Sequence, residues 1–162
     1  MNFNFVPMNK EYANEIAFNW KYEGLYSFYD MTGDEEDLEL FLDENNWKEK
    51  YFGVLDDKGH VVGFYSYSFD EDIMWVGFGL KPNLTGNGIG LEFVMDGINF
   101  GLDHFNYDKK YIMLAVAKFN KRAIKVYERL GFEIIEEYIQ ETNGGEYPFV
   151  KMKKDLSDNY NQ

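Results

Sequence analysis

Apolar and polar residues follow two different periods along the chain, and the switching between these periods predicts a mixed α/β fold. Residues 3–6 alternate in polarity and stop at a proline, which indicates a short first strand. Asn9 is a candidate helix cap, and apolar residues then recur at helical spacing until the helix is expected to end near Gly24. Asp34 is the candidate cap of a second, shorter helix with one apolar face.

The middle of the chain has the two-residue period of strands. Residues 51–55 and 61–69 alternate on either side of a turn at 56–59, which predicts a β-hairpin. A third strand over 73–80 contains two closely spaced glycines, which indicates a bulge or a close approach to the backbone. A glycine-rich turn follows, and then an amphipathic helix over about 91–105.

The last third of the chain returns to strands. Residues 111–117 are a continuous apolar run of strand length, which is typical of a strand covered on both faces. Asn120 is the candidate cap of the next helix. Two final strands flank a turn at 142–145, one over about 132–140 and the other over about 147–152.

The predicted element order is therefore β-α-α-β-β-β-α-β-α-β-β. This order gives a mixed, mostly antiparallel central sheet with helices on both faces. A chain of 162 residues fits one domain, which we place at residues 1–154, followed by a polar tail at 155–162.

Composition narrows the classes of function. The absence of cysteine excludes disulfides, zinc ribbons and a thiol nucleophile, and no metal site is predicted. The N-terminus lacks a signal-peptide pattern and no apolar run approaches the ~20 residues that cross a bilayer, so we expect a cytoplasmic protein without a membrane partner. With 29 acidic and 16 basic residues, the formal charge of -13 argues against a nucleic-acid partner.

The acidic charge is unevenly distributed. Residues 1–80 carry a net charge of -12 and residues 81–162 a net charge of -1. Either the two halves face different partners, or the first half only presents more solvated surface.

The glycine-rich turn at residues 85–90 lies between a predicted strand and a predicted helix. Successive backbone N–H groups and a helix N-terminus at such a place form an anion site. Neither a P-loop nor a dinucleotide fingerprint fits, because no Lys-Ser or Lys-Thr pair follows and Leu91 stands where the fingerprint needs a glycine. Taken alone, the turn favours an anion ligand, with a flexible glycine turn that binds nothing as the weaker alternative.

The turn has a second motif downstream. Thr85-Gly86-Asn87-Gly88-Ile89-Gly90 matches Arg/Gln-x-x-Gly-x-Gly/Ala except at its first position, and Asn120, Ala123, Tyr127 and Gly131-Phe132 match N-x-x-A-x-x-x-Y-x-x-x-G-F. Together with the element order, the two motifs resemble the GNAT family of acetyl-CoA-dependent N-acetyltransferases, and the resemblance covers nearly the whole chain.

The resemblance implies a GNAT-like fold and acetyl-CoA as the acetyl donor. The residues that it implies for binding acetyl-CoA are Phe78, Gly79, Leu80, Thr85, Gly86, Asn87, Gly88, Ile89, Gly90, Asn120, Ala123 and Tyr127. Thr85 departs from the family pattern, so either affinity is weaker or a basic residue such as Lys81, Lys121 or Arg122 supplies the charge.

Two of these residues have implied chemical roles. The Leu80 N–H is the candidate to polarise the acetyl carbonyl, although it is equally compatible with an ordinary ladder bond. The Tyr127 phenol, whose reference pKa is about 10, is the candidate acid toward the leaving thiolate, with a core aromatic as the alternative. Without cysteine, direct attack by the amine in a ternary complex is expected.

In this family the segment between the first two helices walls the acceptor pocket. Here residues 22–30 mix aromatic rings with carboxylates, a composition that suits a cationic amine such as a polyamine, an aminoglycoside-like molecule or a lysine or N-terminal amine. The rings are also compatible with a purely structural role. Glu23 and Asp30 are candidate bases, because neither histidine, His60 in a turn or His104 late in a helix, is well placed.

A non-catalytic acetyl-CoA-binding sensor or interaction subunit is the competing function. It is favoured by Thr85 and by the absence of an obvious base. A homodimer is compatible with the aromatic content, although no interface pattern is visible.

Overall fold

Two compact units make up the chain in the computed structural model, which describes residues 2–85 and 88–156. Unit 1 consists of residues 1–66, 78–89 and 142–145, and unit 2 of residues 67–77, 90–141 and 146–162. Strands β3 and β4 each contribute residues to both units. The division between the units therefore runs through these strands and does not fall in a linker.

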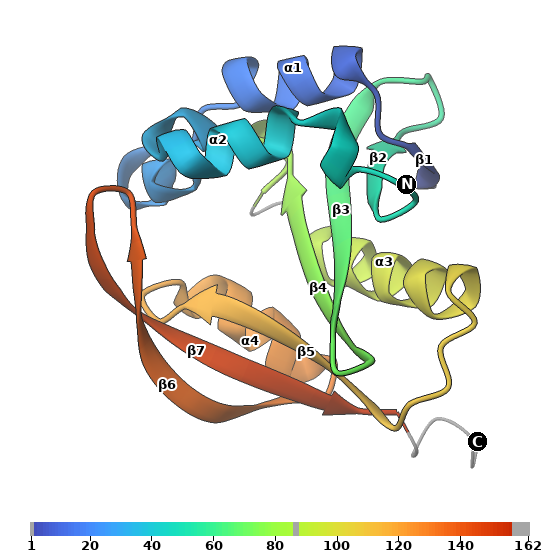
Figure 1. The fold of residues 1–162 in the computed structure, drawn as a ribbon, viewed down its shortest axis with the longest axis vertical. Coiled ribbons are helices and arrows are strands. Elements are labelled where there is room, and N and C mark those ends of the chain that lie inside the picture. The colour runs from blue at the N-terminus through green and yellow to red at the C-terminus, as the bar shows by residue number, and fades with distance from the viewer. Residues whose placement is uncertain (1, 86–87, 157–162) are drawn as a thin grey trace. The chain divides into compact units, whose positions relative to one another are not determined.

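The helices and strands labelled in Figure 1 occur in the predicted order. They are β1 (Asn4–Pro7), α1 (Lys10–Asn19), α2 (Glu35–Leu42), β2 (Tyr51–Leu55), β3 (Val61–Asp70), β4 (Ile73–Leu80), α3 (Gly90–His104), β5 (Tyr111–Ala117), α4 (Lys121–Arg129), β6 (Phe132–Thr142) and β7 (Gly145–Asp155). Four 3₁₀ turns lie at Gly24–Tyr29, Met31–Gly33, Glu44–Asn46 and Pro82–Leu84.

The strands form a seven-stranded sheet in the order β1-β2-β3-β4-β5-β7-β6. β1 pairs antiparallel with β2, β2 with β3, and β5 with β7, whereas β4 and β5 are parallel neighbours. The mixed, mostly antiparallel α/β sheet predicted from the periodicity is therefore confirmed.

Three elements, α1, β6 and β7, differ from their predicted bounds. α1 ends at Asn19 instead of near Gly24, because the Tyr22 N–H donates to Asp30 Oδ1 at 2.8 Å and so makes no helical bond. β6 and β7 are longer than predicted, because Asn143 (φ 51°) and Gly144 (φ 74°) close a two-residue turn that lets pairing continue up to the turn.

Helices α1 and α2 pack against each other in unit 1 (Figure 1). The buried face of α1 is the predicted one, with Ala13, Ile16 and Ala17. Trp20 and Trp47 extend this core, and the Trp47 indole donates to the Phe41 carbonyl at 2.8 Å. The indole N–H is therefore hydrogen-bonded inside an apolar cluster. Without this partner, a buried donor would lower the free energy of unfolding.

Unit 2 contains a close helix-to-strand contact. Tyr67 of β3 is 1% exposed, and its hydroxyl donates to the Gly97 carbonyl of α3 at 2.6 Å. A methyl group at Gly101, one turn further along α3, would lie 2.4 Å from Tyr67 Cε1. The Gly97 carbonyl therefore accepts the hydrogen bond of Tyr67, and the absence of a side chain at Gly101 leaves room for its ring.

β6 lies at one end of the strand order and is largely exposed. Its isoleucines Ile134, Ile135 and Ile139 are about half exposed, at 48%, 53% and 61%. Glu136 forms an ion pair with Lys151 at 3.1 Å, and Glu137 with Lys118 at 2.8 Å.

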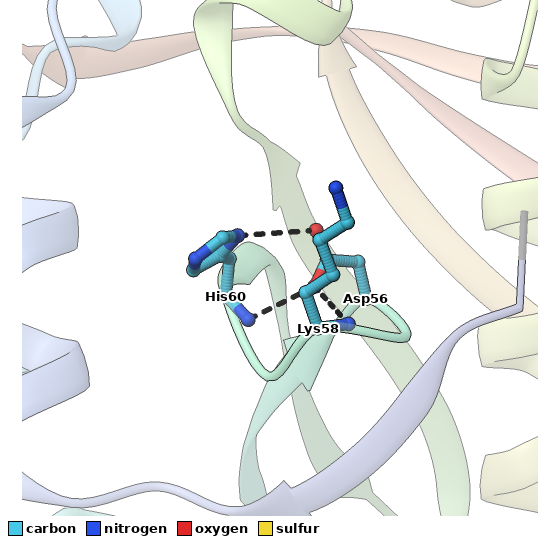
Figure 2. A network of polar contacts seen from close by, with 3 residues as sticks. All are labelled: Asp56, Lys58 and His60. Carbon is cyan, nitrogen blue, oxygen red and sulfur yellow. Dashed lines mark hydrogen bonds and ion pairs between the residues drawn. The ribbon is translucent and has the colours of Figure 1, made fainter.

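The turn between β2 and β3 is held by one carboxylate. Figure 2 shows Asp56 accepting from the backbone N–H groups of Lys58 and His60, both at 2.9 Å, with His60 Nδ1 at 3.6 Å. These backbone donors, His60 first, lower the pKa of Asp56. His60, the first histidine of the sequence, therefore contributes to the structure of this turn through its contacts with Asp56.

At the end of the domain predicted at residues 1–154, β7 continues to Asp155. Leu156 follows it, is 2% exposed, and donates its N–H to the Lys110 carbonyl at 2.8 Å. Within residues 2–85 and 88–156, the helices are all too short or too polar to cross a bilayer. The same residues contain no group of acidic or histidine side chains that would hold a metal ion.

Candidate active site

The end of β4 is shaped by aromatic rings of β3. A Cβ on Gly79 would lie 2.3 Å from Cε1 of Phe64, so the glycine makes room for that ring. Phe78 stacks on Tyr65 with ring centroids 5.1 Å apart. The close approach expected at this glycine is thus a side chain of the neighbouring strand.

Leu80 is the candidate donor to the acetyl carbonyl, and the peptide group that joins it to Lys81 is hydrogen-bonded at both its oxygen and its nitrogen. Its carbonyl accepts a hydrogen bond from the Tyr22 hydroxyl at 2.8 Å. The next N–H, of Lys81, donates to the Val62 carbonyl at 2.8 Å. Residues 22–30, which the sequence predicts to wall the acceptor pocket and which we call the acceptor segment, are therefore hydrogen-bonded to the last residue of β4.

The glycine-rich turn starts with Thr85, whose N–H and hydroxyl both donate to the Pro82 carbonyl, at 3.2 and 2.7 Å. The threonine hydroxyl proton is thus already used. Gly86 and Asn87 lie outside the described residues. Gly88 has a φ of +82°, which favours glycine, and a Cβ at Gly88 or at Gly90 would meet no atom within 4 Å.

The sequence predicts that this turn holds a pyrophosphate group, which needs a backbone that a ligand can approach. Open space beside Gly88 and Gly90 leaves room for a ligand to approach the backbone. α3 begins at Gly90, and the first N–H groups of a helix have no partner within the helix. Ile89, between the two glycines, is half-buried.

The second motif is carried by α4 in unit 2. Asn120 caps this helix as predicted, with Oδ1 accepting from the Ala123 N–H at 3.2 Å. Tyr127 is 9% exposed and its ring meets Phe132 edge-on at 6.2 Å between centroids. The motif thus places Tyr127 on the buried face of α4, which agrees with both interpretations of this residue.

Basic residues near the second motif are not equivalent. Lys121, Arg122 and Lys125 belong to the exposed side of α4. Lys118 is instead paired with Glu137 at 2.8 Å. Of the basic residues that the sequence offers in place of the missing Arg or Gln, Lys121 and Arg122 are thus exposed side chains at the start of α4.

The acceptor segment contains a 3₁₀ helix from Gly24 to Tyr29. At its start, Glu23 is exposed and makes no capping hydrogen bond. At its end, one Asp30 oxygen accepts from the Tyr22 N–H. Of the two candidate bases, Asp30 is thus engaged with the backbone whereas Glu23 faces solvent.

A contact that sequence analysis missed holds the far side of this segment. Asn143, at the tip of the β6–β7 hairpin, donates from Nδ2 to the Phe28 carbonyl at 2.7 Å and from its N–H to Asp34 Oδ2 at 2.8 Å. Thr142 adds its hydroxyl to the same carboxylate at 3.2 Å. Asn143 is 109 residues from Asp34 and 115 from Phe28 along the chain, so no local signal in the sequence reveals these contacts.

Asp34 therefore combines two tasks, since it also caps α2 by accepting from the Asp37 N–H at 3.0 Å. The donors of Asp37, Asn143 and Thr142 lower the pKa of Asp34. Asp37 differs, because burial and the Asp34 charge raise the pKa of its carboxyl.

A pH-dependent stability follows from the lowered pKa. The stabilisation by ionised Asp34 is complete above its ordinary pKa of about 3.9 and is lost as pH falls through the lower value in the folded state. We expect Asp34→Asn to reduce the free energy of unfolding at pH 7 and to have a shrinking effect toward pH 2, measured by urea titration. Asp57→Asn, an exposed charge of the β2–β3 turn, is the matched control. An equal loss at both pH values would contradict this account.

The second histidine lies at the end of α3. His104 stacks on Phe100 at 5.4 Å and meets Phe105 edge-on at 4.8 Å between ring centroids. His104 is therefore part of an aromatic cluster of unit 2. Packing in this cluster accounts for the residue, and no role as a base is needed.

The charge difference between the units is smaller than between the sequence halves. Unit 1 has 14 acidic and 6 basic residues, and unit 2 has 15 and 10. The acidic turn at residues 70–72 belongs to unit 2, so it is not part of the unit that holds the acceptor segment.

The family follows from the sequence itself. The sequence model of the acetyltransferase (GNAT) family matches residues 15–132. The chain belongs to this family of acyltransferases, whose members use acetyl-CoA. The family resemblance and the enzyme class predicted from the two motifs are confirmed. No curated protein matches the chain.

Solved structures agree on the fold. A chimera of spermidine N-acetyltransferase SpeG from Vibrio cholerae and hSSAT has a TM-score of 0.75 at 18% identity, with 99% of both chains covered. Spermidine N-acetyltransferase from Vibrio cholerae in complex with CoA and spermine has a TM-score of 0.70 at 16% identity, with 96% of both covered. Ribosomal-protein-S5-alanine acetyltransferase from Vibrio fischeri has a TM-score of 0.65 at 22% identity, covering 96% of this chain and 94% of that one.

Proposed function

We propose that this acetyltransferase moves the acetyl group of acetyl-CoA to a cationic primary amine, such as a polyamine, an aminoglycoside-like molecule or a peptide amine. One observation carries the assignment of the acceptor. A segment of aromatic rings and carboxylates is hydrogen-bonded, through Tyr22, to the Leu80 carbonyl at the end of β4. Of the three similar structures named above, two are of spermidine N-acetyltransferases, one a chimera and one in complex with CoA and spermine, which supports the same class of acceptor.

The roles of the residues follow from acyl-transfer chemistry. Acetyl-CoA supplies an activated carbonyl. In this proposal the Leu80 N–H donates to the acetyl oxygen, and backbone N–H groups from Gly88 to the start of α3 hold the pyrophosphate. Phe78 and Gly79 line the pantetheine arm, and Asn120 and Ala123 contact it at the start of α4.

Proton transfer is assigned to two further groups. The Tyr127 hydroxyl gives its proton to the departing sulfur. A carboxylate, acting through water, takes the proton of the amine. Glu23 is the better candidate of the two predicted bases because its side chain is exposed and makes no capping bond, whereas Asp30 already accepts from the Tyr22 N–H.

The acceptor side rests on charge as well as on rings. Rings of Tyr22, Tyr26 and Phe28 are half-buried in the segment, so their faces suit a cation only where part of the ring meets solvent. α2 follows with an acidic first turn of Glu35, Glu36 and Asp37. A polycation is attracted by such a field at low ionic strength.

An amine panel tests this proposal. Acetyl-CoA should first raise the melting temperature, because a ligand at about 100 times its Kd adds about 2.7 kcal/mol to stability. Release of CoA, followed with a thiol reagent, should then be faster with spermidine or a lysine peptide than with neutral or acidic amines. Added salt should lower kcat/KM for the cationic amines most.

Three outcomes would contradict the proposal. If saturating acetyl-CoA did not raise the melting temperature, acetyl-CoA would not be the acetyl donor. Binding without CoA release on any amine would favour the sensor function. Faster turnover of acidic or neutral amines would remove the cationic acceptor. Compartment and a homodimer stay predictions from the sequence.

A further inference from the structure

The peptide group between Leu80 and Lys81 is held from two sides by parts of unit 1. On one side the Tyr22 hydroxyl donates to the Leu80 oxygen at 2.8 Å, across 58 positions of sequence. On the other side the Lys81 N–H donates to the Val62 oxygen of β3 at 2.8 Å. A peptide plane fixed at both its oxygen and its nitrogen has little freedom to rotate.

Strand geometry relates this arrangement to the Leu80 N–H. In an extended strand the N–H and C=O of one residue point to the same edge, and those of the next residue to the opposite edge. The Lys81 N–H points toward β3. The Leu80 N–H and C=O therefore both point to the edge of β4 that faces away from β3, where the Tyr22 hydroxyl lies.

An uncovered carbonyl at this edge would oppose the reaction. Negative charge develops on the acetyl oxygen as the amine attacks, and it is stabilised by donors and destabilised by nearby carbonyl dipoles. The Leu80 N–H and C=O are neighbours along one edge, so the carbonyl lies next to the oxygen that the N–H is proposed to bind. A hydrogen bond to that carbonyl reduces the repulsion.

We propose that Tyr22 is a positioning residue of the transfer reaction: its hydroxyl covers the Leu80 carbonyl and fixes the strand end, so that the Leu80 N–H alone faces the acetyl oxygen. The inference rests on the proposed function. Tyr22 also belongs to the acceptor segment, so it connects the wall of the acceptor pocket directly to the strand end.

The hydroxyl is a permanent donor in this position. Burial, and secondarily the Asp30 carboxylate, raise the pKa of Tyr22 above its ordinary value. The phenol therefore keeps its proton throughout the neutral and mildly alkaline range. Asp30 contributes a second time by accepting from the Tyr22 N–H, which fixes the backbone from which the ring projects.

Tyr22→Phe tests the role, because it removes the hydroxyl and keeps the ring. The matched control is Tyr12→Phe in α1, a half-buried tyrosine of the same unit that is not among the hydroxyl donors of the described residues. With the best amine of the panel, kcat should fall about tenfold in Tyr22→Phe, which is the size of one net hydrogen bond. Acetyl-CoA affinity should be unchanged, and the ratio of wild-type to variant kcat should be constant from pH 6 to 9.

A second readout does not depend on turnover. Hydrogen exchange of the Lys81 amide should accelerate in Tyr22→Phe and not in Tyr12→Phe, because the peptide plane loses one of its two supports. Unchanged kcat, unchanged exchange at Lys81, or a loss shared equally by both variants would each overturn the inference. A wild-type protein that releases no CoA with any amine would instead overturn the proposed function, and the catalytic role of Tyr22 with it.

Discussion

Replacing Tyr127 with phenylalanine is expected to lower kcat by about a hundredfold, the lower end of what a positioned general acid contributes. The change removes only the hydroxyl, and the edge-on contact of the ring with Phe132 is kept. The defect should be larger in kcat than in acetyl-CoA affinity, because the proton moves to sulfur only as the thioester breaks. Steady-state CoA release and equilibrium titration with acetyl-CoA measure the two quantities.

Tyr138→Phe is the control for this prediction. Tyr138 lies on β6 in the same unit, and its ring contacts Phe149 at 6.0 Å between centroids. Its loss of a hydroxyl should leave kcat at the wild-type level. If Tyr127 were simply a core aromatic, its phenylalanine variant would match this control in rate, and the acid would have to be sought elsewhere.

Gly101→Ala is expected to lower the free energy of unfolding by about 2 kcal/mol. The added methyl group would lie 2.4 Å from Tyr67 Cε1, so the ring must move and its hydrogen bond to Gly97 is strained. Overpacking costs roughly 1–3 kcal/mol and a lost hydrogen bond about 1 kcal/mol, while alanine returns up to about 1 kcal/mol of helix propensity. For a chain of this length, the loss corresponds to a melting temperature lower by about 4–8 °C.

Gly90→Ala separates the contact from the effect of alanine in a helix. Gly90 is the first residue of the same helix, and a Cβ there meets no atom within 4 Å. Its melting temperature without ligand should therefore stay near that of the wild type. A Gly101→Ala variant as stable as Gly90→Ala would show that Tyr67 repacks at no cost.

Local signals predicted most of the fold. Asn9, Asp34 and Asn120 each cap the helix that the sequence assigned to them, with side-chain oxygens accepting from the N–H groups of Tyr12, Asp37 and Ala123. These interactions span three residues, so the residue type and its position before an apolar period are enough. The family motifs are local in the same sense.

The contacts that complete the site are not local. Tyr22 reaches Leu80 across 58 positions, and Asn143 reaches Phe28 across 115. The sequence indicated an aromatic acceptor segment and a hairpin turn separately, and nothing in either pattern connects them. Gly101 is a similar case, because an isolated glycine in a helix only suggests weakness until the ring that it accommodates is known.

The exposed strand β6 has a consequence for handling the protein. It ends the strand order, so in the described residues its outer row of backbone groups has no neighbouring strand, and three isoleucines would favour pairing with another molecule. Interposed glutamates, Glu136 and Glu137 among them, place like charges opposite any second copy of the strand. Replacing one of these glutamates by a neutral residue should therefore lower the yield of soluble protein and leave the catalytic rate unchanged.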